Sequence, residues 1–204
     1  YDLYSKGQTE SDWKSWQFKT IDGGFVPAEE IARAKRTMDA TLFRQEFEAS
    51  FESTGNRAAW NFDRQIHVKK AKEMSSSLWW GCDFNVAAMT AVLACQYTDG
   101  TIHYFNEVVI KNSNTEEMAR KMKAIAPNIE VYPDPAGKAR STTSNRSDFA
   151  ILQDFGFLIR AKKSHPSHID RLNALNRKLL DAEGNVTMTV DPKCVYLIKD
   201  LEQV

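Results

Sequence analysis

The chain has 204 residues, of which 42% are hydrophobic and 26% are charged, and its formal net charge is zero. This length and composition fit one globular domain, or one domain with an appendage. They exclude a bilayer-spanning apolar run and a protein coated in positive charge, although a local basic patch remains possible.

Two features of the chain bear on its origin. It does not begin with methionine and has no signal-peptide pattern, so we expect a fragment of a longer protein. Its three cysteines, Cys82, Cys95 and Cys194, fit no zinc motif. Reduced thiols in a cytosolic compartment are the simplest interpretation of these cysteines.

The first sixty residues are rich in aromatic side chains and show no strand pattern. Pro27 suits the first position of a helix, and it precedes a predicted helix over residues 28–35. A second helix is predicted over residues 41–48. The segment 53–57, Ser-Thr-Gly-Asn-Arg, is typical of a loop and is a candidate domain boundary.

A strand-rich pattern begins at Leu78. Three strands are predicted, over residues 78–84, 88–97 and 101–110, and Asp99-Gly100 between the last two is a strong hairpin signal. The segment 113–116, Ser-Asn-Thr-Glu, resembles a capping box at a helix start. That helix should bury Met118, Met122 and Ile125 and end at Pro127.

The rest of the chain alternates between strands and helices. A strand is predicted at 129–132, a helix at 148–155, a strand at 157–161, a helix at 167–180, a strand at 186–190, and a helix from about residue 193. Three strands and a helix followed by this alternation predict an α/β fold, with a mixed sheet flanked by helices on both faces.

Asp83 and Asp134 are the most informative polar residues. Asp83 lies in an otherwise apolar strand, where a buried carboxylate needs a metal, a cation or strong hydrogen bonds. Asp134 follows the fourth strand, which can lie parallel to the first through a crossover. Both carboxylates would then meet at one edge and suit Mg²⁺ or Mn²⁺. Alternatively, Asp134 is an ordinary turn residue and Asp83 caps a loop or pairs with an arginine.

Basic residues follow the fourth and fifth predicted strands. If these strands lie beside the first, the residues could flank the acids and hold DNA phosphates. The alternative is a solvated surface that keeps the protein in solution. The candidates for DNA binding are Lys138, Arg140, Arg146, Lys162 and Lys163.

Four segments together resemble the C-terminal nuclease region of phage large terminase subunits. The segments 80–85 (Trp-Gly-Cys-Asp-Phe-Asn) and 131–137 (Val-Tyr-Pro-Asp-Pro-Ala-Gly) are similar to the two acidic motifs of that family. The segments 13–20 and 42–51 also resemble that family, and in the family the second lies between the ATPase and nuclease domains. The order of the four segments is the family's order, and it covers nearly the whole chain.

The resemblance implies an RNase H-like fold and metal-dependent cutting of double-stranded DNA during viral genome packaging. It implies that Asp83 and Asp134 are the catalytic, metal-binding acids. It also implies the portal protein and the small terminase subunit as partners, and the cytoplasm of the bacteriophage's host as location. By the same resemblance, residues 1–57 are the helical tail of an ATPase domain with its linker, and 58–204 are the nuclease domain.

The chain departs from the family pattern in two places. No phosphate-binding loop is present, because Gly137-Lys138 lacks the earlier glycine and the following serine or threonine of that motif. The family's third acid is expected on a late helix, beyond Val204. Nearby alternatives are Asp191, Asp200 and Glu202, none of which lies in a motif that we identify.

Two other functions stay open from the sequence. A noncatalytic DNA-binding or docking module could keep the same fold without a complete acidic cluster. A transposase-like or integrase-like core would share both the sheet and the acids, and it would carry out strand transfer rather than plain cleavage.

Overall fold

The computed structural model describes residues 2–51, 55, 57–72, 77–85, 87–138, 146–162, 164 and 166–203. The described chain forms two compact units. The helical unit contains the residues up to Phe62 together with Ile169–Val186, and the sheet unit contains Asp63–His168 and Thr187–Gln203. The loop expected at 53–57 lies largely outside the described residues.

The helical unit contains three helices that the sequence predicted, α2, α3 and α7, and two that it did not, α1 and η1. Asp39 explains where α3 begins, because its Oδ1 accepts hydrogen bonds from the backbone amides of Thr41 and Leu42. Nearly all of α7, the helix predicted over 167–180, belongs to the same unit, although the sequence analysis assigned this segment to the nuclease domain. The bounds are α1 Asp2–Thr9, η1 Thr20–Gly23, α2 Ala28–Thr37, α3 Ala40–Phe47 and α7 His168–Leu179.

A buried polar side chain holds the helical unit together. Asn176 on α7 is fully buried, and its Oδ1 accepts a hydrogen bond from the amide of Asn61 at 3.0 Å. Its Nδ2 donates to the carbonyls of Ala58 at 2.7 Å and Leu172 at 2.9 Å. Because its polar atoms are paired, Asn176 can be buried without a large desolvation cost.

The sheet unit contains a six-stranded mixed sheet with the strand order β5-β4-β1-β2-β3-β6. The antiparallel β1-β2-β3 meander turns at Gly100, whose φ of 83° is a conformation that favours glycine. β4 lies parallel beside β1, as expected, while β5 and β6 pair in parallel with β4 and β3. The strands are β1 Leu78–Asp83, β2 Ala88–Gln96, β3 Ile102–Lys111, β4 Glu130–Pro133, β5 Leu158–Ile159 and β6 Met188–Val190.

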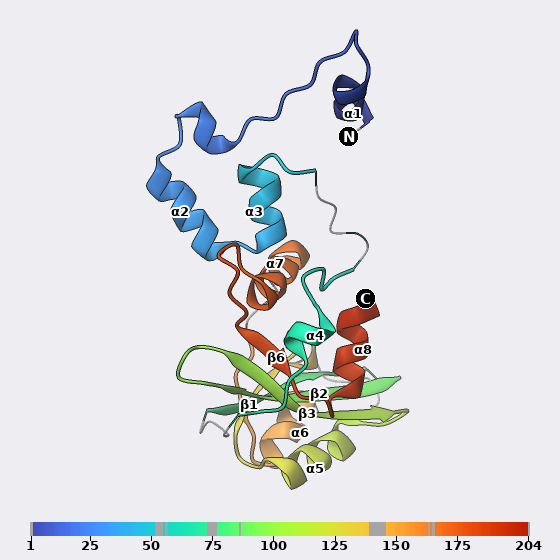
Figure 1. Ribbon diagram of the computed structural model, residues 1–204. Helices are drawn as coiled ribbons and strands as arrows, with labels where there is room; N and C mark the ends of the chain where they lie inside the picture. Colours follow the sequence, from blue (N-terminus) through green and yellow to red (C-terminus); the bar gives the residue numbers. More distant parts are fainter. Residues whose placement is uncertain are drawn as a thin grey trace. The chain divides into compact units, whose positions relative to one another are not determined.

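Helices cover both faces of this sheet (Figure 1). α5 packs against β2 and β3 together with α6, whereas α8 contacts β3 and α4 contacts β6 on the opposite face. The predicted RNase H-like α/β fold, a mixed sheet with helices on both faces, is confirmed. The helices of this unit are α4 Arg64–His67, α5 Thr115–Ile125, η2 Pro135–Lys138, α6 Asp148–Asp154 and α8 Val195–Gln203.

The main core lies between the sheet and α5 with α6. Trp80, Met118, Met122, Val131 and Leu152 are completely buried in it. The prediction that Ile125 joins this core is wrong, because Ile125 is 42% exposed. α5 ends at Ile125, and the extended Ala126 turns into the core instead, where its carbonyl accepts a hydrogen bond from Trp80 Nε1.

The start of α5 also differs from the predicted capping box by one residue. Asn114 is the N-cap, and its side chain accepts a hydrogen bond from the amide of Glu117 at 3.0 Å. Its extended backbone, at φ −135° and ψ 170°, places the side chain over the first turn.

In the described part of the chain, no helix is both long enough and apolar enough to cross a membrane.

Candidate acidic site at the carboxyl ends of the central strands

The structure brings Asp83 and Asp134 to adjacent positions. Asp83 is the last residue of β1, and Asp134 directly follows β4. The two strands pair in register up to Cys82 and Pro133, and the amide of Asp134 donates to the carbonyl of Cys82 at 3.0 Å. Because side chains alternate along a strand, both carboxylates belong to the same face of the sheet.

The surroundings of Asp83 differ from the sequence-based expectation. The predicted buried carboxylate is wrong, because β1 ends at Asp83 and the side chain is exposed. Asp134 is half-buried, and its Oδ1 accepts a hydrogen bond from the amide of Ala136 at 2.7 Å at the start of η2. A ligand can therefore reach both acids from solvent, and the need of a buried carboxylate for a partner is not what points to a ligand here.

A cavity of about 230 Å³ lies in the sheet beside Asp83. At Gly81 the cavity is bounded by neighbouring side chains, since an added Cβ would make ordinary contacts with Val92 Cγ2 at 3.5 Å and with the Trp79 ring at 4.0 Å. The cavity therefore gives a small group access to the backbone next to the acidic pair. Its lining residues are Gly81, Cys82, Asp83, Thr90, Ala91 and Val92.

Asp148 is a third acid at this edge of the sheet, and the sequence analysis missed it. The thiol of Cys82 points into the core, and its pKa is raised, mainly by burial and then by the negative charges of Asp83, Asp148 and Asp134. The negative charges of all three acids therefore act on the buried sulfur of Cys82. Asp148 begins α6, and its Oδ1 accepts a hydrogen bond from the hydroxyl of Thr115. Its place after the fourth strand was the signal that could have identified it.

Asp191, considered as an alternative third acid, lies elsewhere in the sheet. It follows Val190 on β6, which the strand register places level with Trp79 at the far end of β1. β2 and β3 separate it from β1. Its Oδ2 lies 4.0 Å from the Nε2 of His103, so the structure does not bring it to Asp83.

The two acids of α8 differ in their surroundings. α8 packs at its start on β3, where the Glu107 carboxylate accepts hydrogen bonds from two α8 amides. Glu202 forms an ion pair with Arg64 at 3.0 Å, and Asp200 is exposed. Among the described residues, no group of three or more histidine, cysteine or acidic side chains is arranged to hold a metal.

Two of the predicted DNA-binding lysines lie at the same edge as the acids. Lys138 ends η2, directly after Asp134, and is exposed. Lys162 is also exposed and follows β5, where Ile159 pairs with Val131 of β4. This register carries the end of β5 to the edge where β4 and Asp134 end.

The other predicted DNA-binding residues are less informative. Arg146 is exposed, and its guanidinium forms an ion pair with Asp154. Arg140 and Lys163 lie outside the described residues. Arg160, which the sequence analysis did not select, is paired with Glu130 at 2.8 Å and holds the pKa of that carboxyl below its usual value, with a further contribution from the Tyr132 hydroxyl.

Gly137 connects the loops that carry the acids. It is buried in η2 against the ring of Phe84, which follows Asp83, and against the ring of Phe149, which follows Asp148. A Cβ at this position would overlap the Phe84 ring and lie 3.1 Å from Cε1 of Phe149. The absence of a side chain therefore allows the three acid-bearing segments to pack together.

Gly137→Ala is expected to destabilise the sheet unit by about 1–3 kcal/mol, because the added methyl group must displace the Phe84 ring. Thermal or urea unfolding measures this change. Gly23→Ala is the control, since its Cβ would make an ordinary contact at 3.6 Å. Equal stability of the two variants would contradict the packing described for Gly137.

Comparisons with known proteins support the fold. No protein-family model matches the chain, and no characterised protein matches it by sequence. A solved large terminase from a thermophilic bacteriophage is similar in structure, with a TM-score of 0.64, 14% identity, and coverage of 98% of this chain and 50% of that one. The P22 large terminase nuclease domain has a TM-score of 0.59 at 11% identity, covering 72% of this chain and 78% of that domain.

The resemblance to large terminase nuclease domains is thus confirmed at the level of the fold. The chain spans about half the length of the large terminase from the thermophilic bacteriophage. Sequence identities this low carry no site residues from those proteins to this chain. The arrangement of Asp83, Asp134 and Asp148 is therefore interpreted from its own chemistry.

Proposed function

We propose that this chain is a divalent-metal-dependent endonuclease that cuts double-stranded DNA during viral genome packaging. The observation that carries the proposal is the adjacent placement of Asp83 and Asp134 at the carboxyl ends of β1 and β4. The nuclease fold of the similar structures supports it. The portal protein and the small terminase subunit as partners, and the host cytoplasm as location, belong to the same proposal.

The residues present fit a hard divalent cation. Asp83 and Asp134 offer carboxylate oxygens, the ligands that Mg²⁺ and Mn²⁺ prefer, and both can be reached from solvent. When bound, such an ion supplies an activated water and stabilises charge on the phosphodiester. A second ion would require further negative charge, for which Asp148, whose charge acts on the same Cys82 thiol, is a candidate.

The acidic and the basic side chains would have different roles in the reaction. Asp83 and Asp134 would hold the ion at the sheet edge, where the cavity beside Gly81 leaves room for the scissile region. Lys138 and Lys162 would position the DNA backbone from the loops that follow β4 and β5. Contacts of this kind read phosphates rather than bases, so cutting should tolerate many sequences.

The proposal is tested by incubating the purified protein with supercoiled plasmid and MgCl₂ or MnCl₂. Nicked and linear DNA should form, and EDTA should stop the reaction. Tight DNA binding with no cutting under any divalent cation would instead support the noncatalytic DNA-binding module. Joined products from a strand-transfer assay would support the transposase-like or integrase-like alternative.

Neutralising Lys138, Arg140, Lys162 and Lys163 together is expected to weaken DNA binding and reduce its salt dependence. Each lost phosphate contact should lower the slope of log K against log salt by about one unit. Fluorescence anisotropy with a labelled duplex, measured in Ca²⁺ over a range of NaCl concentrations, gives this slope.

A matched control keeps the change in net charge equal. It neutralises four lysines that are not candidates for DNA binding, Lys72, Lys121, Lys123 and Lys199. The control should retain most of the original slope. The same slope for both quadruple variants would place the DNA path elsewhere on the protein.

A further inference from the structure

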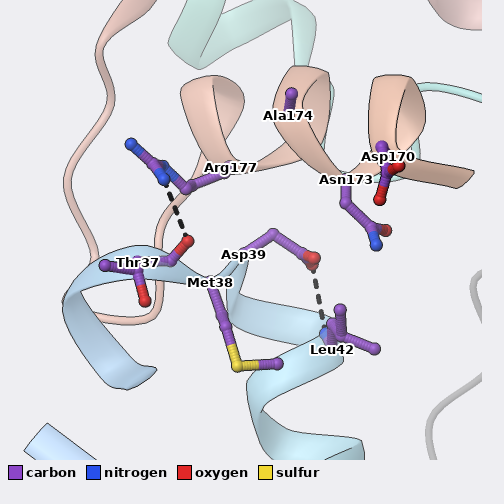
Figure 2. Close-up of a pocket in the computed structure, with 8 residues that line it drawn as sticks. All are labelled: Thr37, Met38, Asp39, Leu42, Asp170, Asn173, Ala174 and Arg177. Atoms are coloured by element: carbon purple, nitrogen blue, oxygen red, sulfur yellow. Dashed lines mark hydrogen bonds between the residues drawn. The ribbon is translucent and has the colours of Figure 1, made fainter. Parts of the chain in front are cut away.

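A second candidate site lies in the helical unit, apart from the acidic residues of the sheet. It is a pocket of about 290 Å³ between the end of α2, the start of α3 and one side of α7 (Figure 2). No part of the proposed nuclease function uses it. Its lining residues are Thr37, Met38, Asp39, Leu42, Asp170, Asn173, Ala174 and Arg177.

Asp39 gives this pocket its chemical character. The residue is only 1% exposed, and its Oδ1 accepts hydrogen bonds from the amides of Thr41 and Leu42 and from the indole of Trp60 at 3.2 Å. Its Oδ2 is buried and has no hydrogen-bond partner among the described residues. A buried carboxylate oxygen without a donor is costly, so an N–H group that displaces the lining side chains enough to reach it gains binding free energy.

The polar side chains of α7 face the same space. Figure 2 shows that Asp170 and Asn173 project from α7 on the side of the pocket away from Arg177, and that the carboxylate of Asp39 lies below α7, where it is bonded to Leu42. Arg177 lies at the other end, where its Nη1 donates to the carbonyl of Thr37 at 3.1 Å. The pocket thus has an end rich in oxygen acceptors and an end with a fixed guanidinium donor.

Apolar surface connects these two ends. Met38 and Leu42 come from the α2–α3 corner, and Ala174 comes from α7. A ligand that crosses the pocket therefore meets acceptors, then methyl and methylene groups, then a cation. Long basic side chains have this sequence of properties, because their aliphatic stems pack on apolar surface while their charged ends bind acceptors.

We propose that this pocket binds the basic side chain of a peptide segment, with arginine as the preferred residue. The guanidinium group would donate to Oδ2 of Asp39 and to Asp170 and Asn173. The aliphatic stem would lie along Leu42, and the peptide carbonyl of the bound residue would accept a hydrogen bond from Arg177. The proposed ligand is a segment of a partner protein, since an arginine within a peptide carries both the cation and the carbonyl.

Two other ligand classes fit the pocket less well. A bare metal ion would fill a small part of 290 Å³ and would meet only the two carboxylates among the lining residues. A phosphate or other anion would be repelled by Asp39 and Asp170. Arginine also matches carboxylates better than lysine, since its planar group presents several donors in a fixed geometry.

The proposal is tested by ¹H–¹⁵N NMR on the full 204-residue chain with Nα-acetyl-arginine amide as the probe. The indole N–H of Trp60, which is bonded to Asp39, is the reporter signal. We expect it to shift saturably with the arginine probe and not with Nα-acetyl-citrulline amide, its uncharged isostere. Methylguanidinium, which lacks the peptide carbonyl, should bind more weakly than the arginine probe.

Two variants locate the binding without relying on Asp39, which also caps α3. Ala174→Leu fills the pocket from exposed α7 and should abolish the shift, while Asp170→Asn should weaken binding by about fivefold. Both variants should keep the parent's melting temperature. Equal binding of arginine and citrulline probes, unchanged binding in Ala174→Leu, or the same Trp60 shift with MgCl₂ alone would overturn the proposal.

Discussion

Asp83→Asn and Asp134→Asn are each expected to reduce metal-dependent DNA cutting by more than about 100-fold. Removing a side chain that only supports a metal ligand typically costs about 10- to 100-fold, and removing the ligand itself should cost more. Asparagine keeps the size of the side chain and one oxygen, but it removes the negative charge that holds a divalent cation. The fold should survive both changes, since Asp83 is exposed and an asparagine at 134 can still accept the hydrogen bond from Ala136.

Cutting is measured by the rate of plasmid nicking in MnCl₂, and metal binding by calorimetric titration with the same ion. Both quantities should fall together, with the melting temperature nearly unchanged. Asp99→Asn is the control, because Asp99 is an exposed turn acid that accepts a backbone hydrogen bond from Thr101. A double variant of Asp83 and Asp134 that cuts at the original rate would remove the basis of the proposed function.

Trp80→Ala is expected to cost about 3–5 kcal/mol of unfolding free energy in the sheet unit. Trp80 lies in the centre of β1 and is completely buried, so truncation leaves a large cavity between the sheet and α5. It also removes the indole N–H that donates a hydrogen bond to the carbonyl of Ala126 at 3.1 Å, and Ala126 is the C-cap residue of α5. The strand that carries Asp83 would then lose its main anchor in the core.

Urea unfolding followed by circular dichroism measures this effect. Trp80→Phe should give an intermediate loss, since the phenyl ring refills most of the space but cannot donate to Ala126. Trp16→Ala is the control for removing an indole, because Trp16 is 68% exposed. If Trp80→Ala unfolded at the same urea concentration as Trp16→Ala, the described core around β1 would be incorrect.

Much of this architecture is already specified by local sequence. The alternation of apolar residues and the Asp99-Gly100 turn predict the three-stranded meander, and the helix that follows predicts the parallel placement of β4. Those two inferences are sufficient to place Asp83 and Asp134 together. They depend only on strand periodicity and on crossover topology, which are properties of short segments and their order.

The remaining features were decided by tertiary packing. The exposure of Asp83 depends on where β1 ends, and the nearness of Asp148 depends on how α6 packs beside η2. The pocket at Asp39 forms because α7, more than a hundred residues further along the chain, packs against the α2–α3 corner. The sequence by itself determined where the strands lie in the chain, the parallel placement of β4 beside β1, and the acidic pair. Only the tertiary structure decided which distant side chains share a surface, because burial and contact between remote segments are set by the packing of the whole unit and leave no local periodicity to read.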